Sequence, residues 1–389
     1  MSIVPPVPAR LRAVAAGMSL VTSLGLAGCG HGSGRPSSGP PPSGPAPSGP
    51  TTGSLATSWQ WAAPRPSYVG MPGTDDAGVA VTFGHSHVVL LDGSGKVRWS
   101  VDQARVRDVA PRLTADAVLV ATEDGMVALD RATGALRWTA SIGERANAPV
   151  VAAGVAVVST WEGSLVGVNV ADGSVKWHTP LPGPALGPAA VSGDAAVVSW
   201  EADHGDGAGV IAVDAATGRQ RWATAVPPDG VSAPAVVAAP GTGPSMVVVA
   251  AGDIAAHALS ADTGAERWRV DIGGAGSPED APLDAGGGAV LVADRLGGMA
   301  LLDAVDGRSR WQVTSDGAAV RGGPAGPGPG GGYALPLEDG RLLLAGPGRA
   351  TTMADPAGRV SGVATGPGGT LVVGVREAAD NTLTASTGW

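Results

Sequence analysis

Residues 128–138, which read ALDRATGALRW, decide the fold because five other stretches of the chain match them. The matching stretches are LLDGSGKVRW (90–99), VNVADGSVKW (168–177), AVDAATGRQRW (212–222), ALSADTGAERW (258–268) and LLDAVDGRSRW (301–311). In each of them Gly stands four residues before Trp, and successive tryptophans lie 39, 39, 45, 46 and 43 residues apart. Self-similarity at this period indicates one supersecondary unit stacked repeatedly on itself.

Each unit predicts two strands joined by a tight turn. The turn begins with Asp or Asn in Asp130, Asn169, Asp214 and Asp303, and such side chains accept backbone N–H bonds within turns. The glycine is expected to have a positive φ, and the Trp should project from the outer strand and cover the gap between neighbouring sheets. The Gly and Trp pairs are Gly95 and Trp99, Gly134 and Trp138, Gly173 and Trp177, Gly218 and Trp222, Gly264 and Trp268, and Gly307 and Trp311.

The spacing of the units predicts an all-β propeller. Apolar strands such as AVLVAT (117–122) and MVVVAA (246–251) precede the turns, and the step fits a four-stranded blade of about 40–45 residues. Residues 58–389 then hold eight blades, with seven as the alternative. A degenerate unit keeps Gly348 but has Thr352 where the Trp belongs.

The ring is expected to close through an N-terminal strand. The segment SWQWAAP (58–64) carries Trp61, 38 residues before Trp99, whereas the last unit lacks its own turn and Trp. We therefore predict that the segment around Trp59 and Trp61 pairs with the last blade. Closure of this kind removes free sheet edges that would otherwise promote aggregation.

The pattern A-x-D-x-x-T-G-x-x-x-W in residues 128–138 and 212–222 resembles the PQQ-like propeller repeat. This repeat occurs in quinoprotein dehydrogenases and in the outer-membrane assembly lipoprotein BamB, and the resemblance covers about 85% of the chain. Quinoprotein dehydrogenases are longer, and require Ca²⁺ ligands, a catalytic Asp and, in many cases, a vicinal disulfide. The chain has a single Cys and no cluster of suitable oxygen ligands, so we expect neither a cofactor nor enzymatic activity.

The N-terminus predicts a lipoprotein. Arg10 and Arg12 precede a stretch of small and apolar residues too short to remain as a membrane-spanning helix. Residues 26–29, Leu-Ala-Gly-Cys, resemble a lipobox, which implies cleavage before Cys29 and lipid attachment to its thiol. The expected domains are a signal peptide (1–28), a lipidated Cys with a disordered Pro/Ser/Gly tether (29–57) and the propeller (58–389).

Composition excludes other classes. The formal net charge is −9, and without Arg10 and Arg12 it becomes −11. No basic stripe is present, which argues against nucleic-acid binding. The single Cys excludes an internal disulfide, so packing and strand pairing must supply the stability.

A few other residues are weaker candidates for sites. His85 and His87 alternate along an expected strand and could form half a metal site, although two solvated histidines are the simpler interpretation. Asp203 and Asp206 lie in an oxygen-rich loop that could hold Ca²⁺ but reads more simply as a solvated turn. The remaining candidates are Trp161 and Trp200, which lie outside the repeat position and either pack between blades or line an interaction surface.

Together these features predict an extracytoplasmic, lipid-anchored binding scaffold without catalytic activity. The expected partners are the membrane, through lipid on Cys29, and a protein of the cell envelope that binds the central funnel or the loops between blades. We expect a monomer. The alternatives are a BamB-like factor in the assembly of outer-membrane proteins and a PQQ-dependent or sugar-active enzyme.

Overall fold

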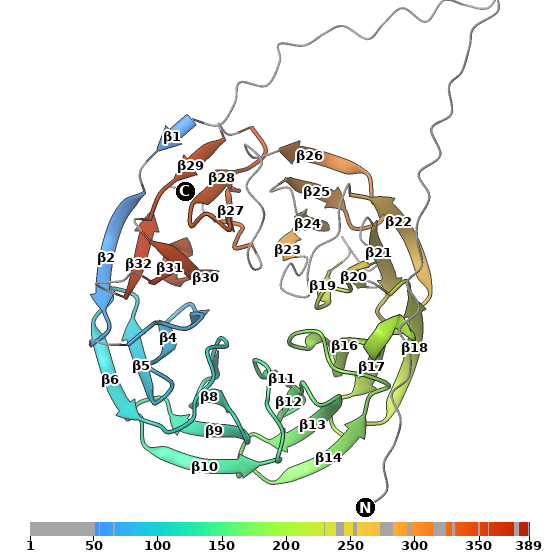
Figure 1. The fold of residues 1–389 in the computed structure, drawn as a ribbon, viewed down its shortest axis with the longest axis horizontal. Helices are drawn as coiled ribbons and strands as arrows, with labels where there is room; N and C mark the ends of the chain where they lie inside the picture. The colour runs from blue at the N-terminus through green and yellow to red at the C-terminus, as the bar shows by residue number, and fades with distance from the viewer. Residues whose placement is uncertain are drawn as a thin grey trace, which may run out of the picture. The chain divides into compact units, whose positions relative to one another are not determined.

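The structure is a computed structural model. It describes residues 51–53, 55–64, 67–228, 230–238, 245–251, 255–272, 283–293, 298–313, 324–328, 331–348, 351–356, 358–376, 381–387 and 389. The described strands form eight four-stranded sheets that are arranged as the blades of a ring (Figure 1). This confirms the prediction of an all-β propeller and decides for eight blades instead of seven.

Six blades are built from consecutive antiparallel strands. Blade one contains β3 (Gly73–Asp75), β4 (Gly78–Phe83), β5 (His87–Asp92) and β6 (Val97–Asp102). Blade two contains β7 (Arg112–Leu113), β8 (Ala117–Thr122), β9 (Gly125–Asp130) and β10 (Leu136–Ser141). Blade three contains β11 (Val150–Ala152), β12 (Val155–Ser159), β13 (Ser164–Asn169) and β14 (Val175–Pro180). Blade four contains β15 (Ala190–Ser192), β16 (Ala195–Glu201), β17 (Ala208–Asp214) and β18 (Gln220–Val226), with the short 3-10 helix η1 (Asp203–Gly205) between β16 and β17.

The remaining blades complete the ring. Blade five contains β19 (Ala235–Val237), β20 (Met246–Ala251), β21 (Ala255–Ser260) and β22 (Glu266–Asp271). Blade six contains β23 (Leu283–Gly286), β24 (Ala289–Ala293), β25 (Met299–Asp303) and β26 (Ser309–Val313). Blade seven joins β27 (Tyr333–Pro336), β28 (Leu342–Ala345) and β29 (Thr352–Ala354) to β1 (Thr51–Gly53). Blade eight joins β30 (Arg359–Thr365), β31 (Leu371–Arg376) and β32 (Thr382–Thr387) to β2 (Ala56–Ala62), and η2 (Pro367–Gly369) lies between β30 and β31.

The ring closes through the N-terminal strand, as predicted. β2 pairs antiparallel with β32, with Trp59 opposite Ala385, so the first and last parts of the propeller share blade eight. Strand pairing begins at Thr51, so the propeller starts at least seven residues before position 58, where the sequence analysis placed its first residue. The Thr-Thr-Gly segment has no apolar alternation, and pairing through backbone groups alone leaves no signal in the sequence.

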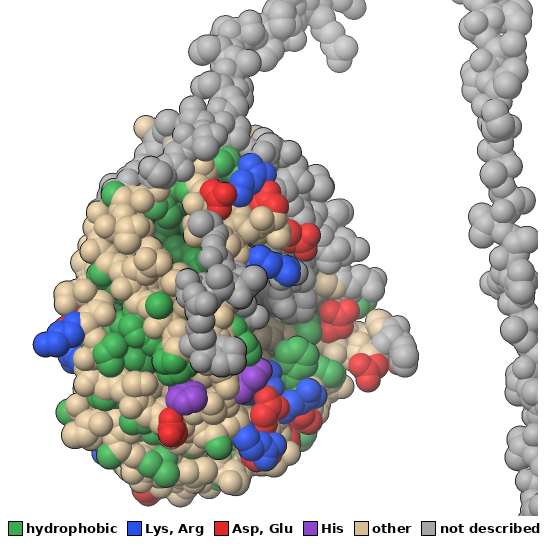
Figure 2. All heavy atoms as spheres, turned by 60° about the vertical axis from the view of Figure 1, so that its left-hand side comes forward, with side chains coloured by type: hydrophobic (Ala, Val, Ile, Leu, Met, Phe, Trp, Pro, Cys, Tyr) green, Lys and Arg blue, Asp and Glu red, His purple; other side chains and the backbone are tan. Residues whose placement is uncertain are grey.

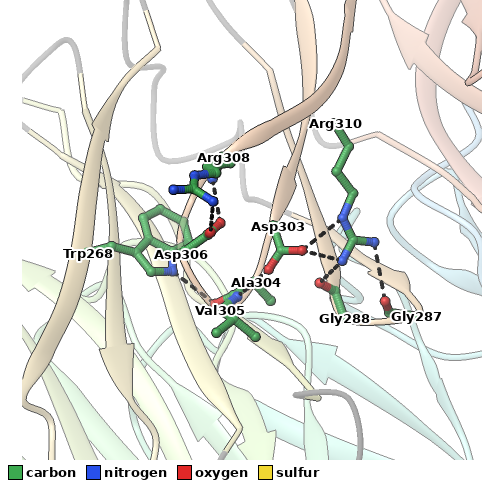
Figure 3. A network of polar contacts seen from close by, with 9 residues as sticks. All are labelled: Trp268, Gly287, Gly288, Asp303, Ala304, Val305, Asp306, Arg308 and Arg310. Carbon is green, nitrogen blue, oxygen red and sulfur yellow. Dashed lines mark hydrogen bonds and ion pairs between the residues drawn. The ribbon is translucent and has the colours of Figure 1, made fainter.

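At six of the eight blade boundaries, one blade is fastened to the next by a Trp that lies on a Gly. The six repeat glycines have φ between +70° and +80°, and a Cβ on any of them would approach a Trp ring of the preceding blade to 2.5–2.8 Å. The Trp Nε1–H also donates to a carbonyl of that next blade; Figure 3 shows Trp268 donating to Ala304 O at 2.9 Å. The close approach of the ring requires a residue without a side chain in the turn, which explains why Gly and Trp repeat together.

The first Trp of this series is Trp59 and not Trp61, which corrects the sequence-based assignment. Trp59 Nε1 donates to Gly93 O at 3.1 Å, and its ring covers Gly95. Trp61 packs edge-on against Phe83, with ring centroids 5.5 Å apart. Trp59 and Trp61 lie two residues apart on β2, so both side chains point to the same side of the strand. Sequence spacing alone therefore could not show which of them covers the Gly.

The two faces of the ring differ in the chain segments they carry. We call the face with the turns after the third strand of each blade, such as residues 93–96, the turn face. The opposite hairpin face carries the hairpins between second and third strands, such as residues 84–86 and 161–163, and the connections from one blade to the next. Apolar clusters fill the spaces between neighbouring blades.

Candidate interaction surface

Trp161 is an exposed aromatic side chain on the hairpin face. It lies in the turn between β12 and β13, and 53% of it is exposed. Among the described residues it is the one aromatic side chain in the set of exposed large hydrophobic residues. A ring of this size left in water is a candidate binding residue, because Trp is enriched at the energetic centres of protein interfaces.

Hydrogen bonds through the buried Asn147 hold the Trp161 ring in place. Its Nε1–H donates to Oδ1 of Asn147 at 2.9 Å, and Asn147 is only 4% exposed. The Asn147 amide N–H groups donate to Ser159 Oγ at 3.1 Å and to Gly187 O at 3.0 Å, which fixes the orientation of the amide. A ring ordered in advance loses little conformational entropy when a partner binds.

Two arginines flank the indole ring. The Cζ atoms of Arg107 and Arg145 lie 5.7 and 5.6 Å from the centroid of the ring, within the range of cation–π contacts. Arg107 belongs to the connection into blade two and Arg145 to the connection into blade three. The ring arrangement therefore brings together side chains that lie far apart in the sequence.

Arg145 is itself anchored by Glu162. Arg145 Nε lies 2.9 Å from Glu162 Oε1, and the Arg145 backbone N–H donates to Oε2 at 3.0 Å. Partial burial on its own would raise the pKa of Glu162, but these hydrogen bonds outweigh burial and lower the pKa. Glu162 is therefore ionised near neutral pH and holds Arg145 beside the indole.

Arg107 is less completely paired. Its side chain is 15% exposed, and its one ion pair within the described part of the chain joins Nη1 to Glu123 Oε1 at the long distance of 3.5 Å. Its Nε is buried and has no hydrogen-bond partner among the described residues. A guanidinium has five N–H donors, so Arg107 retains the capacity to bind a carboxylate or a carbonyl oxygen from a partner.

The surface is built on a second repeat that the sequence analysis missed. Arg105 pairs with Asp124 at 2.5 Å in blade two, at the positions that Arg145 and Glu162 occupy in blade three. Trp161 takes the place that Glu123 has in blade two. The match between TEDG (122–125) and TWEG (160–163) is the sequence signal of this second repeat, and it lies outside the Gly and Trp turn.

Trp200 and Trp161, which the sequence left with two interpretations, have different environments. Trp200 is partly buried and packs against the apolar cluster between blades three and four, near Gly209. Trp161 lies on the surface described above. Thus one residue fills space between blades and the other faces solvent.

The expectation that His85 and His87 share one face of a strand is wrong. His85 lies in the turn before β5 with a φ of +55°, and only His87 belongs to the strand. His85 Nδ1 lies 3.7 Å from Asp108, whereas His87 Nε2 lies 3.1 Å from Asp102 and its ring stacks on Phe83. The turn breaks the alternation, which a sequence pattern of period two cannot reveal.

The acidic loop of blade four is exposed. Asp203 and Asp206 both face solvent in and after η1, on the hairpin face. Within the part of the chain that the structure describes, no three His, Cys, Asp or Glu side chains gather closely enough to hold a metal ion. Asp203 and Asp206 therefore remain candidate Ca²⁺ ligands on the basis of the sequence alone.

A cavity of 210 Å³ lies between blades five and six. Apolar side chains form most of its wall, including Val270, Ile272 and Leu302. The cavity lies next to Ala300, whose position in the other blades is filled by larger side chains such as Ile211. Its lining residues do not include those of the Trp161 surface.

The predicted lipidation site and the predicted N-terminal segments lie largely outside the part of the chain that the structure describes. Cys29, the predicted lipidation residue, lies outside the described residues, as do the signal peptide and most of the tether. No helix in the described part of the chain is long and apolar enough to cross a membrane.

Solved structures show where this fold occurs. BamB from Moraxella catarrhalis is 17% identical, with a TM-score of 0.66 over 86% of this chain and 97% of that chain. The C-terminal WD40 domain of Sif2 is 12% identical, with a TM-score of 0.66 over 87% and 99%. A europium-containing methanol dehydrogenase is 15% identical, with a TM-score of 0.64 over 84% and 85%. At these identities the similarity shows the fold alone.

Sequence comparison identifies the family. No curated protein sequence matches the chain. The model of the family described as outer membrane protein assembly factor BamB matches residues 84–240 and 235–350, which together span more than half of the chain. These matched segments contain the Trp and Gly turns of blades one to six as well as Trp161. The chain is therefore a PQQ-like β-propeller and belongs to the family of the outer membrane protein assembly factor BamB.

Proposed function

We propose that this chain is a non-catalytic binding scaffold outside the cytoplasm, attached to the membrane through lipid on Cys29. Its partner is a protein of the cell envelope that binds the hairpin face at Trp161. The observation that supports this most strongly is an exposed indole ring held by a buried Asn147 and flanked by Arg107 and Arg145. Trp and Arg are the residues most enriched at energetic centres of interfaces.

The charges around Trp161 indicate what kind of partner segment fits. Arg105, Arg107 and Arg145 each have a carboxylate neighbour, so the surface is mixed in sign and not a strongly basic patch. On the side of the molecule shown in Figure 2, basic and acidic side chains also lie next to one another. A segment with an apolar side chain for the indole and a carboxylate for Arg107 would match both features, and the ion pair would favour correct orientation.

Cross-linking in intact cells tests the proposal, with full-length chain tagged at its C-terminus. We expect Trp161→Ala to lower capture of the envelope partner at least 10-fold. Leu136→Ala, which removes an exposed apolar side chain from the outer wall of blade two, should leave capture unchanged. Equal capture by Trp161→Ala and wild type would place the binding site elsewhere.

The lipid anchor is tested separately with Cys29→Ala. We expect this variant to leave the membrane fraction and to lose the partner, because anchoring keeps both proteins at one surface. A variant that remains in the membrane fraction would show that another segment holds the chain there.

Family membership favours one specific version of this function, the assembly of outer-membrane proteins. In a host with an outer membrane, deletion of the gene should lower the amount of folded β-barrel protein in that membrane, and Trp161→Ala should reproduce the defect. An enzymatic role is the competing possibility. Supplying purified protein with PQQ and Ca²⁺ should produce no dye reduction with alcohols or sugars, and turnover would contradict a purely binding role.

A further inference from the structure

The contacts that fasten one blade to the next are not uniform around the ring. From the boundary between blades eight and one to that between blades five and six, a Trp ring covers a Gly in the following blade. The pairs are Trp59 on Gly95, Trp99 on Gly134, Trp138 on Gly173, Trp177 on Gly218, Trp222 on Gly264 and Trp268 on Gly307.

Blade seven lacks this contact on both sides. Gly348 has the same positive φ, +70°, but a Cβ placed on it would meet no atom within 4 Å, so Trp311 does not cover it. In the outer strand β29, Thr352 stands four residues after Gly348, where the other blades have Trp. No Trp therefore extends from blade seven to blade eight.

The N-terminal segment covers this boundary instead. β1 adds to the outer edge of β29 in parallel orientation, with Thr51, Thr52 and Gly53 opposite Thr352, Met353 and Ala354. Two residues later the chain enters β2, the outer strand of blade eight (Figure 1). The same short segment thus pairs with both blades.

Leu55, between β1 and β2, occupies the boundary itself. It packs against the apolar cluster shared by blades seven and eight, which includes Leu342, Leu371 and Trp389. Trp389, the last residue, donates from Nε1 to Gly369 O at 2.9 Å within the same boundary. Both ends of the described propeller therefore supply apolar side chains where the repeat Trp is missing.

We propose that Thr51–Gly53, Leu55 and β2 form a strap that holds the ring closed between blades seven and eight, and that release of the strap opens the ring at this boundary first. The two halves of the strap differ in strength. β2 pairs along six residues and carries the covering Trp59, whereas β1 pairs along three residues, so β1 is the half that releases first.

This arrangement links ring closure to the chain segment before Thr51. Any protein that binds that segment in an extended form, or any force along it, acts directly on the pairing of β1 with β29. The Trp and Gly contacts between consecutive blades from one to six involve no residue of this N-terminal segment. Regions held by few backbone bonds open with the smallest free energies.

Hydrogen exchange of the full-length chain tests the strap. In Thr52→Pro/Gly53→Pro, proline removes the N–H groups that β1 needs for pairing. We expect the amides of β29 to exchange at least 10-fold faster, with unchanged rates in blades two to four. Ser43→Pro, in the Pro-rich segment far upstream of β1, is the matched control and should change no rate.

Leu55→Ala tests whether the Leu55 side chain helps to hold blades seven and eight together. We expect it to accelerate exchange in both β29 and β32, because it removes the side chain that packs between their blades, whereas Leu136→Ala should not. Unchanged exchange in β29 for the double proline variant would overturn the proposal. So would a uniform increase across all blades, since that result would reflect global destabilisation instead of opening at one boundary.

Discussion

At the scale of single residues, the repeat Trp found at six of the eight blade boundaries is both an apolar filler and a hydrogen-bond donor. Trp138 is 8% exposed, and its Nε1 donates to Val170 O at 2.9 Å. We expect Trp138→Ala to lower the free energy of unfolding by about 3–5 kcal/mol, measured by urea denaturation, because it leaves a large cavity. Trp161→Ala should cost less than about 1 kcal/mol, since that side chain is exposed. A loss below about 1 kcal/mol for Trp138→Ala would contradict its role in fastening blades.

The glycine beneath that ring has two reasons to be Gly, and two substitutions separate them. Gly173 has φ +75°, and an added Cβ would lie 2.7 Å from Trp138 Cδ2; Gly154 has φ +73° with no atom within 4 Å of such a Cβ. Gly154→Ala should cost about 1–2 kcal/mol from backbone strain alone. Gly173→Ala should cost about 1–3 kcal/mol more, because the ring must move. Equal costs in thermal unfolding would show that strain alone selects Gly.

At the scale of the element, one residue in the third strand of blades one to six has a side chain that faces the preceding blade. This residue comes directly before the one that pairs with the repeat Trp. The residues at this position are Val89, Val127, Val166, Ile211, His257 and Ala300. His257 is 2% exposed, and neither ring nitrogen has a hydrogen-bond partner among the residues that the structure describes. Its Nδ1 lies 3.6 Å from a Glu266 carboxylate oxygen, which is too long for a hydrogen bond.

This burial makes the stability of the protein depend on pH. Desolvation lowers the pKa of His257, and the attraction of Glu266 compensates only in part. The unfolded chain therefore binds a proton below about pH 6.5 while the folded protein does not, so stability falls as the pH decreases through and below 6.5. We expect His257→Leu to reduce this loss in urea titrations between pH 7.5 and 5. Identical pH slopes for wild type and His257→Leu would contradict the assignment.

At the scale of the whole molecule, eight blades form one closed ring because β2 supplies the missing strand of blade eight. Removal of residues 54–63 leaves the outer edge of β32 unpaired, and an open edge promotes association between molecules. We expect this deletion to lower the melting temperature and to produce higher oligomers in size-exclusion chromatography. A monomer with an unchanged melting curve would show that the ring does not depend on β2.

Most of the architecture could be predicted from the sequence because it depends on local geometry that repeats. The turn requires Gly at a positive φ, the Asp at its start binds its own backbone, and the Trp follows at a fixed distance. The Gly and the Trp recur six times in the chain and the Asp four times, so the blade, its spacing and the need for a closing strand were all visible. The Gly and Trp of one interlock come from different blades, and only their common spacing indicated that they meet.

The tertiary structure alone decided which closing Trp covers Gly95, where the propeller begins, and which residues meet at the candidate site. Trp59 and Trp61 point to the same side of one strand, so only the contacts with the neighbouring blade show that Trp59 is the one that covers Gly95. Pairing of β1 uses backbone groups, which no side-chain pattern records. Arg107, Arg145 and Trp161 come together because the packing of blade two against blade three places their connections side by side. The sequence determined the repeating unit because its causes are local, and the structure determined the site because its causes are contacts between units.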